Sequence, residues 1–335
     1  GSEMCIRDRN KNMNKFMSWL EDSFVPKANK LFSRPFIAAF SSTMQKIIPF
    51  ILTGSAIYFY NVIKSFVPVL PDLSPILTYS FGIITVIVAF MMGNQLMEKL
   101  GHPDYVINAG LCAVGTLLMV AMPLGDNADS ISTLMGNLGA AGIAVGLIVG
   151  LYVGTIFHLW GKLHFLQDSS CPDFVAAWIN TIVPNLITLG IAMVLVNVLK
   201  LDVYSLVIAA FMPLASIGQT LPGFILICLI PAFFYTLGIS SWTFNAVTTP
   251  IFMAGIQANI DAVAAGGVAT NIVTSESVFT LAFITMGGMC ATLGLNALMC
   301  FSKSKQLKTL GRVFIIPSIF NINEPIMYGL SLIHI

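Results

Sequence analysis

Charge is the property that this sequence has least of. Of its 335 residues only 9% are Asp, Glu, Lys or Arg, whereas soluble domains carry about a quarter. The formal net charge is +1, so the chain has no bulk electrostatic field that would attract nucleic acid. The low charged fraction argues against a soluble domain, and because the net charge is close to zero we expect no nucleic-acid partner.

Cysteine is also sparse, and no cluster of metal-ligating side chains accompanies it. The six cysteines stand singly, with no CxxC pair and no Cys/His group at metal-ligand spacing. Cysteine in an apolar run usually packs as a small hydrophobic residue. The sequence therefore predicts no metal site, and we expect no cofactor.

Apolar residues, by contrast, are abundant and occur in long runs. They make up 56% of the chain, and several runs exceed the roughly 20 residues that a helix needs to cross a bilayer. These runs predict an all-α polytopic membrane protein with about eight transmembrane helices, amphipathic helices and the start of a re-entrant hairpin. The expected spans cover residues 36–63, 74–97, 105–122, 138–160, 177–199, 218–238, 243–260 and 277–301.

The few charges are distributed unevenly, and their distribution predicts the orientation. Eight of the 16 Lys and Arg residues precede residue 47, and four more lie in a loop predicted at 302–312. The loop predicted at 123–137 carries Asp but neither Lys nor Arg. Because cytoplasmic loops are enriched in Lys and Arg, we expect a cytoplasmic N-terminus, the 302–312 loop inside and 123–137 outside. Residues 13–35 are expected to form an amphipathic helix against membrane lipid.

Small and helix-breaking residues mark three further features. One series of glycines recurs every four residues and predicts a packing seam, at a helix pair or a subunit interface: Gly142, Gly146, Gly150 and Gly154. Residues 201–217 are too short before Pro213 to cross a bilayer and are expected along the outer surface. Residues 239–276 mix apolar and polar types. They predict either a discontinuous span at 243–260, as in substrate-binding helices of transporters, or a loop with an interfacial helix.

One polar stretch lies inside an apolar run near the end of the chain. From Phe320 to Gly329 the sequence reads FNINEPIMYG, which brings a carboxylate, two amides and a proline to membrane depth. A carboxylate in hydrocarbon is costly, so Glu324 is a functional candidate. Pro325 disfavours helical backbone at Glu324, which favours a re-entrant tip that lines a polar cavity. The alternative is an ordinary helix start with Asn323 as N-cap.

The same stretch resembles a known family. RVFIIPSIFNINEPIMYG, at 312–329, resembles the signature of the membrane-embedded C component of the bacterial sugar phosphotransferase system, in its lactose/cellobiose/diacetylchitobiose family. GGMCATLG at 287–294 and CPDFV at 171–175 are similar to two other segments of that family. The Asn-Glu-Pro element at 323–325 is the most specific of these matches.

The resemblance implies a homodimeric permease in the bacterial inner membrane. Residues 36–200 would form a scaffold and dimerisation domain, and residues 201–330 the sugar-binding transport domain. The sugar, a β-linked disaccharide such as cellobiose, diacetylchitobiose or lactose, would be released inside as a phosphate ester. A cysteine on a separate cytoplasmic B component would donate the phosphoryl group. The expected partners are therefore the sugar, that B component, a second copy of the chain and membrane lipid.

The resemblance also implies roles for particular residues. Glu324 would contact the sugar hydroxyl that is phosphorylated, accept its hydrogen bond and take its proton. GISSW at 238–242 matches the family's Gly-Ile-His-Gly, so Ser240 stands in place of an active-site histidine and cannot act as a cation. Trp242 is expected either to stack on the sugar or to anchor the chain at the membrane interface. The other candidates for sugar contacts are polar neighbours of these positions: Asn321, Asn323, Ser241 and Asn245.

Two further interpretations of the function stay open. In the first, Glu324 is the coupling-ion site of a secondary sugar transporter, because that class also places a carboxylate at a broken helix. In the second, the chain is a non-transporting scaffold.

Residues 1–12 and 331–335 do not match the family and are expected to be non-native flanks of a truncated chain that does not itself transport. Three histidines, His102, His158 and His164, are expected on the surface beside cytoplasmic loops.

Overall fold

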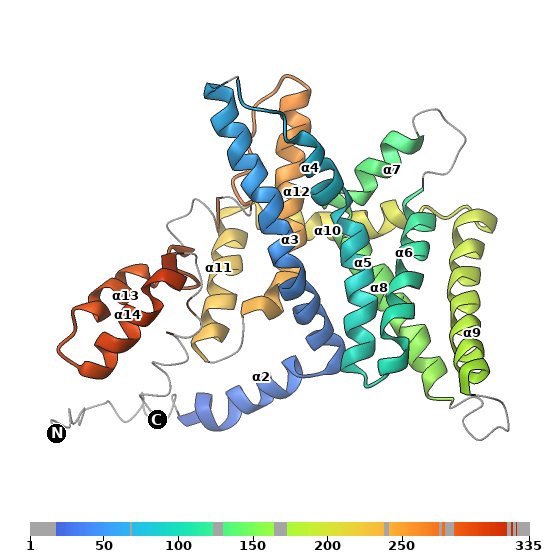
Figure 1. The fold of residues 1–335 in the computed structure, drawn as a ribbon, viewed down its shortest axis with the longest axis horizontal. Coiled ribbons are helices and arrows are strands. Elements are labelled where there is room, and N and C mark those ends of the chain that lie inside the picture. The colour runs from blue at the N-terminus through green and yellow to red at the C-terminus, as the bar shows by residue number, and fades with distance from the viewer. Residues whose placement is uncertain are drawn as a thin grey trace.

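The computed structural model describes residues 18–67, 69–122, 130–163, 173–237, 241–274, 277–278, 285–319, 323 and 326. Every regular element in these ranges is a helix, which confirms the predicted all-α class (Figure 1). Four helical stretches there are long and apolar enough to span a membrane: Ser74–Lys99, Pro103–Ala121, Ala140–Gly161 and Trp178–Val198. A bent helix pair makes a fifth candidate, so the total of about eight spans stays a prediction.

The N-terminal helix lies across the foot of the first long helix. A π-helical turn, η1 (Leu20–Phe24), leads into α2 (Val25–Phe32). Together they bury Leu20 and Ala28 and expose Lys27 and Lys30. This division confirms the amphipathic helix over its described part. Arg34 has extended backbone, as expected for a residue before proline, and α3 (Pro35–Phe66) starts in a new direction (Figure 1).

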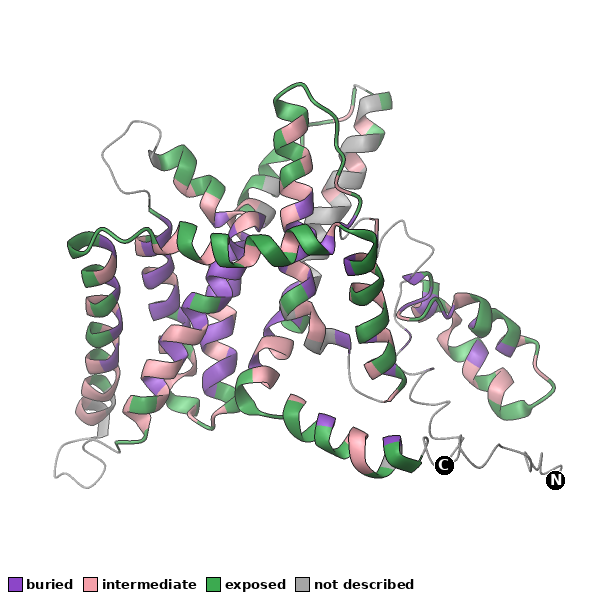
Figure 2. Cartoon of the chain, turned by 180° about the vertical axis from the view of Figure 1, so that it is seen from behind, coloured by how far each residue is buried: buried purple, intermediate pink, exposed green. Residues whose placement is uncertain are grey.

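Three helices form the core of the first half of the chain. They are α5 (Ile84–Lys99), which follows α4 (Ser74–Ser80) and η2 (Phe81–Ile83); α6 (Val106–Ala121), which follows η3 (Pro103–Tyr105); and α8 (Ile143–Gly161), which follows η4 (Ala140–Gly142). The buried positions gather where these helices meet (Figure 2). Together with α3 and the short elements that precede them, these helices lie within a few residues of the first four predicted spans.

The predicted glycine seam lies between two helices of the same chain, α8 and α5, which was one of its two predicted locations. A Cβ on Gly146 would lie 2.8 Å from the Thr85 carbonyl oxygen, and one on Gly150 only 2.5 Å from the Met92 Cβ. Gly154 similarly faces Leu96 of α5 at 2.6 Å. Only hydrogen fits at these positions, so the series lets α8 pack directly against α5.

The chain then turns through an elbow into its second half. α9 (Asp173–Met193) packs on α6 and α8, and η5 (Val194–Val198) follows it. α10 (Val203–Gly218) follows and is bent by 94° from α11 (Leu221–Thr236) at Gln219 and Thr220. α10 runs across the direction of the bundle helices (Figure 1), which agrees with a helix that lies along a surface.

The last helices correct three predictions. α12 (Asn245–Ala264) is one continuous helix despite Pro250, so the expected discontinuity is wrong; irregular backbone follows it at 267–274. The predicted span at 277–301 is wrong as a single helix, because 285–292 form turns before α13 (Leu293–Cys300). The prediction of a basic loop at 302–312 is also wrong from Lys305 onward, where a helix begins.

That basic segment forms a helical hairpin instead. α14 (Lys305–Ile319) begins within the predicted loop and packs back on α13. Gly311 allows the contact, since a Cβ there would lie 2.6 Å from the backbone nitrogen of Cys300. In the predicted outer loop, residues 130–137 likewise belong to a helix, α7 (Ser130–Leu138).

Candidate functional site

A buried asparagine joins three segments that are distant in sequence. The Tyr235 hydroxyl, at the end of α11, donates a hydrogen bond of 2.8 Å to Oδ1 of Asn323. The Asn323 Nδ2 donates to the Met289 carbonyl oxygen at 2.7 Å and to the Thr292 Oγ1 at 2.6 Å. Tyr235 and Asn323 are each 1% exposed. We call these four residues the Asn323 hub.

The turns at 285–292 are shaped to receive this asparagine. Gly288 has a φ of +102°, and a Cβ on it would lie 2.3 Å from the Asn323 Cγ. Gly287, Cys290 and Ala291 also have positive φ, a region that residues other than glycine rarely adopt. Thr292 closes the segment by donating to the Gly287 carbonyl oxygen at 2.8 Å. Glycine at 288 therefore removes the steric and backbone obstacles to the contact.

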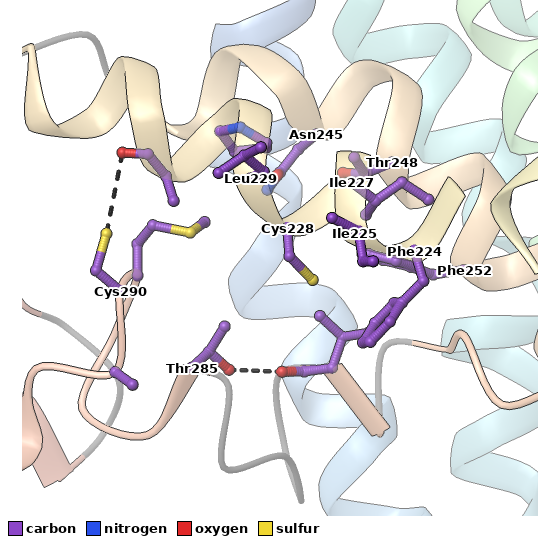
Figure 3. A pocket seen from close by; sticks show the side chains of 15 residues that line it. Phe224, Ile225, Ile227, Cys228, Leu229, Asn245, Thr248, Phe252, Thr285 and Cys290 are labelled. Atoms are coloured by element: carbon purple, nitrogen blue, oxygen red, sulfur yellow. Dashed lines mark hydrogen bonds between the residues drawn. The ribbon is translucent and has the colours of Figure 1, made fainter. Parts of the chain in front are cut away.

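The same turns line a cavity of about 440 Å³ (Figure 3). Its opposite walls come from α11 and from the first turns of α12. The lining is mainly apolar and aromatic, with a few polar groups from Asn245, Thr248 and Thr285. A largely apolar cavity with a small number of placed polar groups is typical of small-molecule sites. Its volume lies within the range of roughly 300–1,000 Å³ that such sites occupy.

Comparison with known proteins identifies the family. Residues 36–334 match the family described as "Phosphotransferase system, EIIC". This chain belongs to the phosphotransferase system EIIC family. EIIC proteins are the sugar permease components of that system, and the chain is accordingly a multi-pass membrane protein.

Relatives and a solved structure agree with this assignment. The EIIC chain is 24% identical to the "Putative permease IIC component YwbA" of Bacillus subtilis (strain 168), over 96% of this chain and 78% of that protein. It is 23% identical to the "PTS system cellobiose-specific EIIC component" of Geobacillus stearothermophilus, over 96% and 77%. The crystal structure of the transporter ChbC, the IIC component of an N,N'-diacetylchitobiose-specific phosphotransferase system, has the same fold. That match has a TM-score of 0.74 at 21% identity, and covers 94% of this chain and 78% of ChbC.

The structure brings some of the predicted site residues of this EIIC chain together. Asn245 lines the cavity, and Ser241 is buried in η6 (Ser241–Phe244), directly before α12. Asn323 lies in the hub. Trp242 belongs to η6, but its side chain lies outside what the structure describes. Three predicted residues also lie outside the described ranges: Ser240, Asn321 and Glu324.

The residues that hold Asn323 and the threonines that add polar groups to the cavity were not among the site residues predicted from the sequence. Tyr235 stands in an apolar run with no pattern to single it out, and its partner is 88 residues away. Thr285 is an isolated polar residue in an apolar run, whereas Thr248 is one of several polar residues in the mixed stretch at 239–276. Met289 and Thr292 had a signal, because both lie in the glycine-rich segment that resembles the family.

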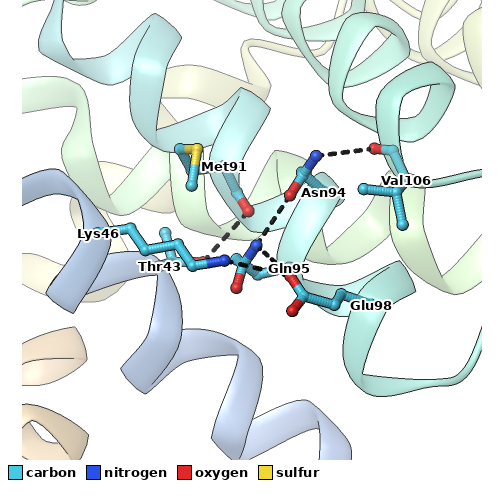
Figure 4. A network of polar contacts seen from close by, with 7 residues as sticks. All are labelled: Thr43, Lys46, Met91, Asn94, Gln95, Glu98 and Val106. Atoms are coloured by element: carbon cyan, nitrogen blue, oxygen red, sulfur yellow. Dashed lines mark hydrogen bonds and ion pairs between the residues drawn. The ribbon is translucent and has the colours of Figure 1, made fainter. Parts of the chain in front are cut away.

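A second polar network ties the first half of the EIIC chain together (Figure 4). Lys46 of α3 lies 3.2 Å from the Oε2 of Glu98 on α5, which also accepts a hydrogen bond of 2.8 Å from Gln95. Asn94 of α5 donates to the Val106 carbonyl oxygen of α6 at 3.3 Å. The network connects α3, α5 and α6 away from the cavity residues, and we assign it a structural role.

Two histidines depart from their prediction. His102 and His158 are half-buried, with the His102 Nε2 and the His158 Nδ1 2.9 Å apart, so both are less exposed than predicted. Gly161 leaves room for the first ring, because a Cβ there would lie 2.8 Å from its Cε1. His164 lies outside the described residues.

Proposed function

We propose that the permease to which this EIIC chain belongs imports a β-linked disaccharide of the cellobiose, diacetylchitobiose or lactose type, coupled to its phosphorylation by a cytoplasmic B component. The names of its relatives support this sugar class: besides the cellobiose-specific protein, they include a lichenan permease IIC component and an oligo-beta-mannoside-specific EIIC component of Bacillus subtilis. Lactose-specific EIICB proteins of staphylococci, also among the relatives, carry a B component in the same chain.

The observation that carries the proposal is the Asn323 hub beside the cavity. Asn323 directly precedes Glu324, and its amide holds that point of the chain to the turn whose residues Met289, Cys290 and Ala291 wall the cavity. An anchored residue next to a carboxylate limits where that carboxylate can be placed. This is the support that a sugar-binding acid or base needs, because such a group acts only within hydrogen-bond reach of the hydroxyl.

The chemistry that we assign to Glu324 is proton acceptance. Its carboxylate accepts a hydrogen bond from the attacking sugar hydroxyl and takes the proton while the oxygen bonds to the phosphoryl phosphorus and the bond to the donor cysteine of the B component breaks. Asn245, Ser241, Ser240 and Asn321 supply hydrogen bonds to the sugar, and Trp242 a stacking face. Asn323, whose amide is engaged with protein on both its atoms, contributes by position.

The remaining features complete the proposed transporter. Residues 36–200 form its scaffold and dimerise, residues 201–330 carry the sugar, and the N-terminus is cytoplasmic. The hairpin of α13 and α14 carries the exposed side chains of Lys303, Lys305 and Arg312. This is the face to which an acidic surface of the B component docks.

An ion-coupled sugar carrier with Glu324 as its ion site is the alternative, and energy coupling separates the two. Membrane vesicles that contain the protein are supplied with labelled cellobiose, phosphoenolpyruvate, the general phosphocarriers and a B component. The proposal predicts cellobiose phosphate that depends on the B component and resists an ionophore. Accumulation of unmodified cellobiose that an ionophore abolishes would establish the carrier instead.

A further inference from the structure

The segment that follows α12, residues 267–274, has no regular secondary structure, and side-chain amides satisfy part of its backbone. Gln219, at the elbow between α10 and α11, makes two hydrogen bonds to the backbone of Val273. Its Nε2 donates to the Val273 carbonyl oxygen at 2.8 Å, and its Oε1 accepts from the Val273 backbone nitrogen at 3.0 Å. One amide thus makes the pair of hydrogen bonds that a neighbouring β-strand residue would make.

A second amide repeats this arrangement two residues earlier. Asn259 of α12 donates from Nδ2 to the Asn271 carbonyl oxygen at 2.9 Å and accepts from the Asn271 backbone nitrogen at 2.8 Å. Asn259 and Gln219 therefore hold the segment at two residues, Asn271 and Val273. We call residues 267–274 the connector and the two amides the connector clamp.

α12 is shaped to let the segment approach. A Cβ on Gly255 would lie 2.7 Å from the Gln219 Nε2 and 2.8 Å from the Val273 carbonyl oxygen. Val273 and Thr274 are buried beneath this contact. The fit fixes the connector against both α12 and the elbow.

Hydrogen bonds continue from the connector to the cavity. The Thr274 backbone nitrogen donates to the Ser277 hydroxyl at 3.0 Å, and the Val278 nitrogen donates to the Thr274 carbonyl oxygen at 3.0 Å. The Thr285 hydroxyl then donates to the Val278 carbonyl oxygen at 2.6 Å (Figure 3). Val278 and Thr285 both line the cavity.

We infer that Gln219 and Asn259 are positioning residues for the sugar site: they clamp the connector and so fix the wall formed by Val278, Thr285 and Cys290. The link to sugar rests on the proposed function; the link to the wall does not. Neither Gln219 nor Asn259 lines the cavity, so the clamp acts without touching a sugar bound there.

The test compares variants that remove the clamp with one that spares it. Gln219→Leu and Asn259→Leu each remove both hydrogen bonds that the amide makes to the connector backbone. Asn259→Asp keeps the acceptor and loses the donor. Gln257→Leu is the matched control, because Gln257 also lies on α12 but donates to Asp261 rather than to the connector. Asn259→Asp also serves where a leucine variant does not fold.

Two measurements report separately on the position of the cavity wall and on the use of the sugar. The first is the rate of maleimide labelling at Cys290, an exposed thiol on the wall, read by peptide mass spectrometry in the intact membrane protein. The second is the KM and maximal rate of cellobiose phosphorylation. We expect clamp loss to change the labelling rate by about tenfold and to raise the KM by a similar factor at unchanged maximal rate, because two hydrogen bonds to the connector are lost. Asn259→Asp should fall between wild type and leucine.

The outcomes are distinct. Labelling and KM that shift in the clamp variants and not in Gln257→Leu support the inference. Folded clamp variants with unchanged labelling at Cys290 overturn it. If wild type itself does not phosphorylate cellobiose, the proposed function fails, and the labelling result still decides whether the clamp fixes the wall.

Discussion

Removing the Tyr235 hydroxyl tests the Asn323 hub most selectively. In Tyr235→Phe the ring is kept, and the buried Oδ1 of Asn323 loses the donor that lies 2.8 Å away. A buried polar atom left without a partner costs about 1–3 kcal/mol, so we expect the variant to fold with lower thermal stability. Tyr60→Phe is the matched control: the Tyr60 hydroxyl also donates at 2.9 Å, to the Pro71 carbonyl oxygen, but at an exposed site. Its loss should have little effect.

Asn323→Asp is nearly isosteric and should cost more. The carboxylate keeps the acceptor for Tyr235 but places an oxygen where Nδ2 donates to the Met289 carbonyl oxygen and to Thr292. Thr292 already donates to Gly287, so its hydroxyl cannot also donate to the new carboxylate. Two lost hydrogen bonds and a buried charge or a costly protonation add up to about 3 kcal/mol or more.

The assay is thermal denaturation of the purified protein in detergent, followed by loss of the monodisperse species. The hub predicts midpoints in the order wild type and Tyr60→Phe, then Tyr235→Phe, then Asn323→Asp. Equal midpoints for all four proteins would refute the packing of Asn323 described above. A stable Tyr235→Phe with impaired cellobiose phosphorylation would show the hub acting on the neighbouring Glu324.

Two glycine substitutions give further predictions with internal controls. Gly150→Val should destabilise the α5–α8 pair by about 1–3 kcal/mol or more, because its Cβ meets the Met92 Cβ at 2.5 Å and the Ala89 carbonyl oxygen at 2.8 Å. Gly190→Ala, on α9 with nothing within 4 Å, should be neutral or slightly stabilising in the same melting assay; equal effects would contradict the seam. Gly288→Ala should lower the midpoint more than Gly266→Ala, since both have positive φ but only the first meets Asn323 at 2.3 Å. Similar losses would mean that backbone strain alone sets the cost.

The helices of the first half were predictable because their sequences are simple. Each is a long apolar run, and the helical stretches Ser74–Lys99, Pro103–Ala121 and Ala140–Gly161 lie within a few residues of their predicted spans. The glycine seam was also readable, because a four-residue repeat keeps one face of a helix free of side chains. Length, hydropathy and period are local properties, so a sequence displays them directly.

The second half resisted prediction for physical reasons that residues 277–301 illustrate. Hydropathy reports apolar content and not backbone conformation, so the apolar turns at 285–292 look like part of a membrane helix. Non-glycine positive φ at Cys290 and Ala291 has no sequence signal. α14 escaped notice because Lys and Arg suggested a loop, although both are good helix formers.

The candidate site divides in the same way. The Asn-Glu-Pro element could be found from chemistry, because a carboxylate and amides are anomalous in an apolar run. Its support could not, since Tyr235 reaches Asn323 only through the tertiary fold, and Gln219 and Asn259 are ordinary polar residues until the connector lies beside them. Polar residues in membrane proteins are easy to notice, but their partners are set by packing.

The central claim is that Glu324 serves phosphorylation of the bound sugar, and one comparison tests it most directly. Cellobiose phosphate formation is measured with the phosphorylated B component for wild type, Glu324→Gln and Asp104→Asn, where Asp104 is an exposed carboxylate in η3. The account predicts that Glu324→Gln, reaching the membrane at wild-type level, loses at least about a hundredfold in rate, as expected when a general base is removed, while Asp104→Asn keeps full activity. A Glu324→Gln protein that phosphorylates cellobiose at the wild-type rate would contradict it.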